Sequence, residues 1–117
     1  MRTESCLVVG RYDDRQSTPQ TLHRMVEALR ASLDRPVNWM VCAFGRHEFH
    51  CLMEAVRLGG HVRVGFENSL LLRSGEVAAD NRQLITQLVE SGNPGGRPVA
   101  DSHQARQILG SEAVAEA

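Results

Sequence analysis

The sequence lacks the features that define several large classes of protein. Its apolar runs are only a few residues long, too short for a membrane span or a signal-peptide core. Acidic and basic residues nearly balance, with a formal net charge of -1, and aromatic residues make up only 4% of the chain. Interspersed charges of both signs do not form the basic surface that nucleic acids need. We therefore expect neither a membrane nor a nucleic acid as partner.

Cysteine is scarce, and common site motifs are missing. Cys6, Cys42 and Cys51 are odd in number, lie in apolar runs and have no CxxC or CxxH spacing. This pattern predicts buried free thiols and a reducing compartment, so we expect a cytoplasmic protein. The sequence contains no P-loop and no GxSxG elbow, and neither Gly59-Gly60 nor the glycines at 92–96 form GxGxxG after a strand.

The 117 residues suffice for one domain but not for a complete eight-stranded α/β barrel, which needs about 250 residues. Apolar periodicity predicts alternating strands and helices. The expected strands are 6–10, 37–44 and 61–67, and the expected helices are 19–34, 48–58, 81–90 and 102–109. Residues 1–110 then form the domain, and 111–117 a frayed tail.

Helix starts are well defined by capping residues. Thr18 precedes a proline, and Asp80 and Asp101 are each followed three residues later by glutamine, Gln83 and Gln104, as in a capping box. Strands that alternate with helices predict a parallel sheet with right-handed crossovers. All three strands then end on one rim.

The stretch from His61 to Asn68 is the most informative. It places one set of residues (His61, Arg63, Gly65, Glu67) on one strand face and an apolar set (Val62, Val64, Phe66) on the other. Helices usually cover both faces of a parallel sheet, which would require partners for Arg63 and Glu67. The rim position also allows Arg46 to converge with them.

A strand-end glutamate such as Glu67 has three possible roles: metal ligand, general base or ion-pair partner. The ion pair is the leading interpretation for a single carboxylate, because zinc takes about four ligands. A second possibility is a local zinc site built from His47 and His50. Their spacing is not that of HExxH, so polar residues at a helix start are the leading interpretation.

Several segments together resemble the C-terminal part of the β-keto acid cleavage enzymes, whose best-known member is 3-keto-5-aminohexanoate cleavage enzyme. The segments are Trp39 with Gly45-Arg46-His47, the stretch 58–67 (LGGHVRVGFE), Asn81 with Leu84, 96–100 (GRPVA), Ala105-Arg106 and 108–110 (ILG). Such enzymes are (β/α)8 TIM barrels that hold a divalent metal, usually Zn2+, through an HxH pair and a glutamate. The resemblance implies that Glu67 is this metal ligand.

The resemblance also implies a reaction. In the family, a β-keto acid and acetyl-CoA exchange acyl parts to give acetoacetate and a new CoA ester, through a Claisen-type condensation and its reverse. Arg63 corresponds to an arginine that orients the base and stabilises charge. The base is an aspartate that directly follows the metal glutamate, and Asn68 stands at its position here.

Two departures from the family pattern shape the expected function. An asparagine cannot take a proton, so base catalysis worth roughly 10²–10⁴-fold would be lost. The HxH ligands are absent, and the chain corresponds to the last three units of a barrel. We expect a truncated or split member of the family, or alternatively an inactive remnant or assembly partner. Open sheet edges predict a homo-oligomer or a complementing N-terminal half.

Overall fold

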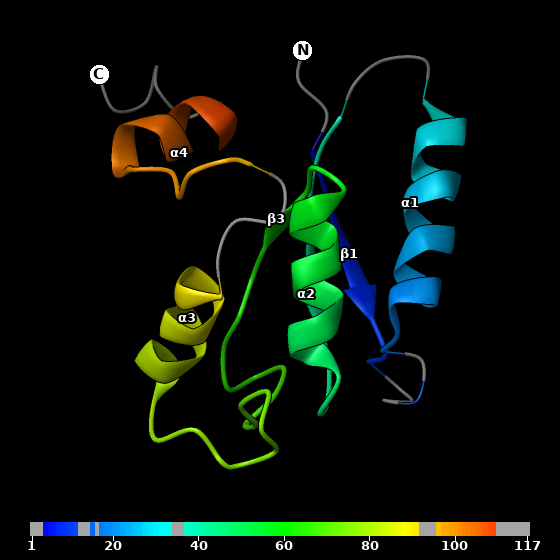
Figure 1. Ribbon diagram of the computed structural model, residues 1–117. Coiled ribbons are helices and arrows are strands. Elements are labelled where there is room, and N and C mark those ends of the chain that lie inside the picture. The colour runs from blue at the N-terminus through cyan, green and yellow to red at the C-terminus, as the bar shows by residue number, and fades with distance from the viewer. Residues whose placement is uncertain (1–3, 12–14, 16, 34–36, 92–95, 110–117) are drawn as a thin grey trace.

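A computed structural model describes residues 4–11, 15, 17–33, 37–91 and 96–109 (Figure 1). Its elements in chain order are β1 (Glu4–Val9), α1 (Pro19–Ser32), β2 (Asn38–Ala43), α2 (Glu48–Arg57), β3 (His61–Val62), α3 (Asn81–Glu90) and α4 (Ser102–Leu109). This is the predicted order of strands and helices. The expected tail, 111–117, and the expected end of the first helix at Asp34 lie outside the described residues.

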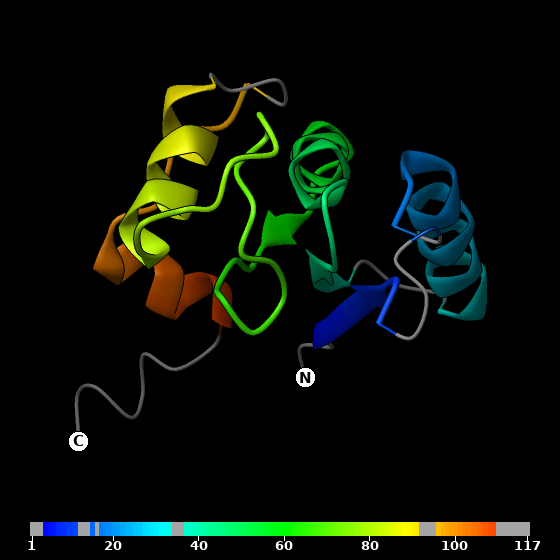
Figure 2. The same cartoon turned by 90° about the horizontal axis from the view of Figure 1, so that it is seen from below.

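The three strands form one parallel sheet in the order β1-β2-β3. The predicted parallel α/β arrangement is therefore confirmed. Helices α1 and α2 lie on the same side of this sheet, as the view from below shows (Figure 2). Between them, alternate strand residues and the inner helix faces form the core, which includes Val9, Leu22, Val41 and Leu52. None of the helices in the described part of the chain has the length and apolar character needed to cross a membrane.

The predicted capping residues begin their helices. The backbone N–H of Thr21 donates to Thr18 Oγ1 at 3.2 Å, at the start of α1. The N–H of Gln83 donates to Asp80 Oδ1 at 2.9 Å. At α4 the capping box is reciprocal, because Asp101 Oδ1 accepts from the N–H of Gln104 while Gln104 Oε1 accepts from the N–H of Asp101.

The third strand is much shorter than its valine alternation predicts. Strand β3 ends at Val62 instead of residue 67, although the N–H of Arg63 still donates to Val41 O at 3.0 Å. The chain then turns, with the N–H groups of Asn68 and Ser69 both donating to Gly65 O. In the described residues β3 pairs on one side only, with β2. The turn at Gly65, which the valine alternation does not encode, takes the chain out of the sheet before residue 67.

The connection between β3 and α3 contains a small hairpin. Leu71 and Val77 form an antiparallel bridge. The N–H of Leu72 donates to Glu76 O, and the N–H of Ala78 donates to Leu70 O, each at 2.8 Å. A turn at 73–75 forms the tip of this hairpin, where the N–H of Gly75 donates to Leu72 O at 2.9 Å.

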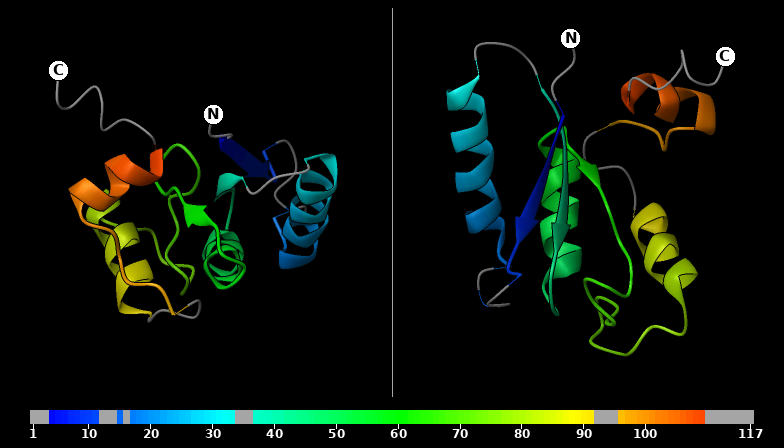
Figure 3. Two further views of the ribbon diagram at one scale, coloured as in Figure 1. Left: turned by 90° about the horizontal axis from the view of Figure 1, so that it is seen from above. Right: turned by 180° about the vertical axis from the view of Figure 1, so that it is seen from behind.

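Only one face of the sheet is covered by helices, so the expectation of cover on both faces is wrong for the described residues. Seen from behind, β1 and β2 lie in front of α2 with no helix over them (Figure 3). We call this side the open face. Cys6 and Arg63 on it are exposed, and Val8 is 38% exposed. Helices α3 and α4 lie beyond β3, and Asn38 Nδ2 donates to Ile108 O at 2.7 Å to hold α4.

Candidate functional site

The loops that follow the three strands meet on the carboxyl rim of the sheet. Ser17 is fully buried there. Its hydroxyl donates to Val9 O at 3.0 Å and accepts from the N–H of Phe44 at 3.3 Å, which joins the ends of β1 and β2. The N–H of Gly45 donates to Asn68 O at 3.4 Å, which joins the turn after β2 to the turn after β3. The predicted common rim is therefore present, although no sequence signal identified Ser17.

Glu67 lies on the exposed turn after β3. This turn is fixed to the start of α3, because the N–H of Phe66 donates to Asn81 Oδ1 at 3.0 Å. The Glu67 side chain folds back over Gly65, where an added Cβ would come within 2.3 Å of Glu67 Oε2. The carboxylate therefore lies on the rim. It can approach the backbone of residue 65 this closely because glycine has no side chain.

Arg63 and Arg46 are exposed, and neither forms the ion pair with Glu67 that the sequence favoured. Glu54 is the carboxylate that pairs with His23 and with Arg57. Arg63 instead lies near the thiol of Cys42. The negative charge of Glu67 raises the pKa of the nearby Glu48 carboxyl. Because the open face leaves both candidate residues in water, neither needs a buried partner.

Glu48 is a rim residue at the start of α2 that no sequence pattern singled out. It stands in the first turn of α2, yet it is only 2% exposed, and its Oε2 atom has no hydrogen-bond partner. Burial and the neighbouring charge of Glu67 raise the pKa of Glu48 to about 8. The carboxyl is therefore largely protonated at neutral pH. The sequence does not reveal the burial of Glu48, because both a polar residue, His47, and an apolar residue, Phe49, flank it.

Asn68 points into the protein, whereas its neighbour Glu67 points out. Asn68 is 6% exposed, and its Oδ1 atom has no hydrogen-bond partner. Burial and the nearby Cys6 thiol raise the pKa of Cys42, while Arg63 and a hydrogen bond from the Asn68 side chain lower that pKa. The buried Asn68 amide therefore lies near the sulfur of Cys42.

The alternative zinc site at His47 and His50 gains no further ligand in the described residues. Both histidines are exposed, and His50 packs edge-on against Phe49 with ring centroids 5.7 Å apart. No group of three or more His, Cys, Asp or Glu side chains in the described ranges is placed to hold a metal ion. Glu67 likewise stands without other ligands from this part of the chain.

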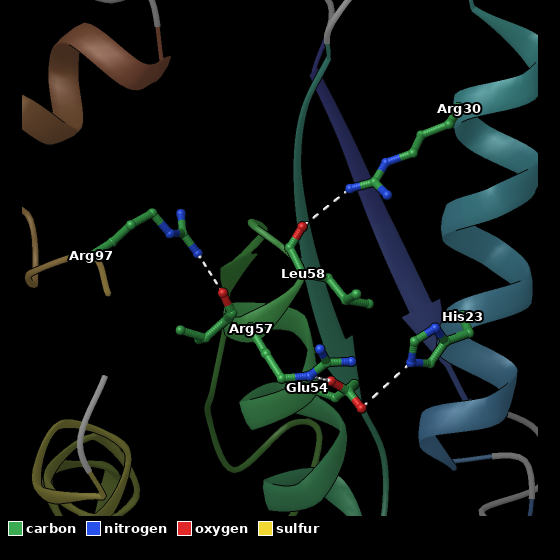
Figure 4. Close-up of polar contacts among 7 residues, drawn as sticks. His23, Arg30, Glu54, Arg57, Leu58 and Arg97 are labelled. Carbon is green, nitrogen blue, oxygen red and sulfur yellow. Dashed lines mark hydrogen bonds and ion pairs between the residues drawn. The ribbon is translucent and has the colours of Figure 1, made fainter. Parts of the chain in front are cut away.

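The main polar contacts between elements lie away from the rim (Figure 4). His23 Nε2 lies 3.4 Å from Glu54 Oε2, and Arg57 also pairs with Glu54. Arg30 donates to Leu58 O at 3.1 Å, and Arg97 donates to Val56 O at 3.0 Å and to Gly60 O at 2.6 Å. These arginines hold the carboxyl end of α2, so they support the fold and not the site.

A parallel α/β sheet with charged side chains on its carboxyl rim is the arrangement on which α/β enzymes build their active sites. The sequence model of one such family, beta-keto acid cleavage enzyme, matches residues 2–110, and the chain belongs to this family.

Curated relatives agree with this assignment. The 3-keto-5-aminohexanoate cleavage enzyme of Fusobacterium nucleatum is 38% identical over 78 residues, covering 67% of this chain and 29% of the relative. The enzyme of the same name from Acetoanaerobium sticklandii is 36% identical over 94 residues, covering 80% and 33%. The 3-oxoadipate:acetyl-CoA acetyltransferase of Cupriavidus necator is 35% identical over 72 residues, covering 62% and 25%. The chain thus spans a third or less of the length of these relatives.

Proposed function

We propose that this chain carries the Glu67 and Arg63 part of a β-keto acid cleavage site. The reaction would convert a β-keto acid and acetyl-CoA to acetoacetate and a new CoA ester. Family membership over residues 2–110 is the observation that carries the proposal. The names of two relatives support a keto acid, and the name of a third supports acetyl-CoA as acyl donor.

The described residues do not form a complete metal site, so we assign no reaction step to a metal. They offer the exposed carboxylate of Glu67 and no group of three His, Cys, Asp or Glu side chains placed to hold a metal. A catalytic zinc ion takes about three protein ligands. If Glu67 binds a divalent cation such as Zn2+, the other ligands must come from a further segment or a further chain.

Arg63 is suited to bind the negative charge of the substrate. Its backbone is fixed by the hydrogen bond from its N–H to Val41 O, and its guanidinium is exposed on the open face. A guanidinium binds a carboxylate through two parallel hydrogen bonds and stabilises negative charge that develops in a carbanion. We assign to Arg63 the orientation of the β-keto acid.

Asn68 occupies the position at which the family resemblance implies a general base. Its amide cannot accept a proton, and its side chain is buried against Cys42. Without a base the carbanion forms slowly, by the roughly 10²–10⁴-fold that such catalysis contributes. This residue favours the alternative role, in which the chain is an inactive remnant or an assembly partner.

We further propose that the three strands correspond to the last three units of a (β/α)8 barrel. The uncovered sheet face and the short match to each relative support this correspondence. The open face would then form part of the barrel interior. A second copy of this chain, or a separately encoded N-terminal half, would complete the interior.

Turnover and metal content of the tag-free chain test the proposal together. Acetoacetate formation from a β-keto acid and acetyl-CoA, with zinc added, should stay well below about 1 per second. Asn68→Asp, assayed with the complementing half, should raise the rate, and Glu67→Ala should abolish that gain. Turnover at ordinary enzyme rates by the unaltered chain would contradict the role given to position 68. Stoichiometric zinc retained by the Glu67→Ala variant would move the metal site to His47 and His50.

A further inference from the structure

The turn that bears Glu67 is joined at both ends to the segments that follow it. At its start, the N–H of Phe66 donates to Asn81 Oδ1 at 3.0 Å, at the first residue of α3. At its end, Oγ of the buried Ser69 accepts from the N–H of Leu71 at 3.1 Å, at the base of the hairpin. The position of the turn therefore depends on where α3 and the hairpin lie.

The hairpin is closed by its own backbone hydrogen bonds. The N–H of Leu72 donates to Glu76 O near the tip, and the N–H of Ala78 donates to Leu70 O at the base, each at 2.8 Å. A contact made at the tip of the hairpin therefore also fixes its base, next to the turn that bears Glu67.

Arg73, at the tip of the hairpin, contacts both neighbouring helices. Its backbone N–H donates to Gln87 Oε1 on α3 at 3.0 Å, and its Nη1 atom lies 3.5 Å from Ser91 Oγ, at the end of the same helix. Its Cζ atom lies 5.4 Å from the centre of the Phe49 ring, in the first turn of α2. A guanidinium within about 6 Å of a ring centre is attracted to the ring face. One residue therefore joins the hairpin to α2 and to α3.

The apolar packing of α3 gives these polar contacts influence over where the helix lies. Leu84 of α3 is fully buried, but Ile85 and Val89 are 51% and 52% exposed. Helix α2 is packed more firmly, with Leu52 fully buried in the core. Arg73 thus ties a helix that buries little of its apolar surface to one that belongs to the core.

We propose that Arg73 is a positioning residue of the rim site, which sets the place of the Glu67 carboxylate. It acts through other residues, because it holds the hairpin and α3 against Phe49, and these two segments hold the turn. A carboxylate that binds a ligand must be kept within about 0.5 Å of its productive position by the contacts around it. The role in the reaction rests on the function proposed above for Glu67, whereas the effect on the position of the turn does not.

A contact that served the hairpin alone would have a different consequence. Its loss would loosen the tip, where Gly75 donates to Leu72 O, and leave the surroundings of Glu67 unchanged. In the proposed role the loss also reaches Phe66, because its partner Asn81 belongs to α3 and moves with that helix.

The test is NMR spectroscopy of the full chain without metal or substrate. Arg73→Gln should change the carboxyl carbon shift of Glu67. It should also speed solvent exchange of the Phe66 N–H roughly two- to fivefold, which corresponds to the loss of an exposed cation–π contact. Gln87→Ala should move the same two signals, although it changes no charge. Arg73→Lys keeps a cation over the ring and should restore most of both.

Arg106→Gln is the matched control, because Arg106 is exposed on α4 and its substitution removes the same charge. It should leave the signals of Glu67 and Phe66 unchanged. Arg73 is also exposed, so its substitution leaves the core intact, and urea unfolding confirms that each variant is folded.

Two results would overturn the role of Arg73. The first is faster exchange confined to the Gly75 N–H, with Glu67 and Phe66 unchanged in both Arg73→Gln and Gln87→Ala. The second is an equal change of these signals in the control variant. Because both readouts are taken without metal or substrate, a lack of turnover would contradict the function proposed for Glu67 and not the positioning role.

Discussion

The carboxylate of Glu67 lies over the α-carbon of Gly65, with Oε2 only 2.3 Å from the place where a Cβ would stand. The backbone of Gly65 is not left-handed, so the glycine is required by this close approach and not by its dihedral angles. Gly10 differs, because its φ is 80° and an added Cβ would meet Ser17 Oγ at 1.9 Å. A substitution at Gly65 therefore tests the position of the Glu67 side chain, whereas a substitution at Gly10 tests the stability of the fold.

Gly65→Ala should displace the Glu67 side chain while leaving the fold nearly as stable, because a flexible carboxylate can rotate away. Gly10→Ala should cost at least about 1–2 kcal/mol for the left-handed backbone, plus the disturbed Ser17 hydrogen bonds. Urea unfolding measures both effects, and carboxyl NMR shifts report on Glu67. An equal loss of stability in the two variants would contradict this distinction.

Stability should fall as pH rises because of Glu48. Burial and Glu67 raise its pKa from 4.5 to about 8, so the folded chain keeps a proton that the unfolded chain releases. This contribution is complete below about pH 4.5. It declines with a slope approaching 1.4 kcal/mol per pH unit and levels off above about pH 8. Glu48→Gln, which mimics the protonated form, should remove the decline in urea unfolding between about pH 5 and 8.

The exposed Glu76 provides the matched control for Glu48. Glu76→Gln should leave the slope of stability against pH unchanged. If Glu48→Gln kept the slope of the unaltered chain, Glu48 would be ionised in the folded state. That result would contradict the burial of the Glu48 carboxyl beside Glu67.

Arg97 should matter more for stability than Arg30, although both donate to carbonyls at the end of α2. Arg97 donates to Val56 O and Gly60 O and is partly buried, whereas the exposed Arg30 donates to Leu58 O. Hydrogen bonds from charged groups are worth about 1.5–3 kcal/mol, less when exposed to water. Arg97→Ala should therefore lose more unfolding free energy than Arg30→Ala in urea titrations.

The same pair of variants has a second readout at His61. Burial, and then the charge of Arg97, lower the pKa of His61 below 6.5. Arg97→Ala should raise the pKa of His61 toward its ordinary value in an NMR titration, while Arg30→Ala should not. A pKa that stays constant in both variants would mean that burial alone sets it.

The open face and the strand edges should make the isolated chain associate. Val8 is 38% exposed, and Cys6 is exposed beside it on edge strand β1. Unpaired edges and exposed apolar surface favour self-association or capture by a complementing N-terminal half. Ultracentrifugation at micromolar concentration should show oligomers, and Val8→Lys should shift them toward monomer. A monomer of the unaltered chain that melts cooperatively would refute this expectation.

Local signals in the sequence were sufficient for the order of elements, the helix starts and the family. Thr18, Asp80 and Asp101 cap their helices as predicted, because a capping hydrogen bond joins residues only a few positions apart. The stretch that ends in Glu67 carried the family resemblance, since its residue types and spacing are contiguous. These features depend on neighbours in the chain, which the sequence displays directly.

Tertiary structure alone decided how long β3 is, which face is open and where the site residues point. Strand β3 ends at Val62 because the chain then turns, with the N–H groups of Asn68 and Ser69 both donating to Gly65 O. Glu48 is buried and Asn68 turns inward toward Cys42 because loops from three separate strands converge on them. Burial and pKa depend on what distant segments bring to a residue, and no local pattern encodes that.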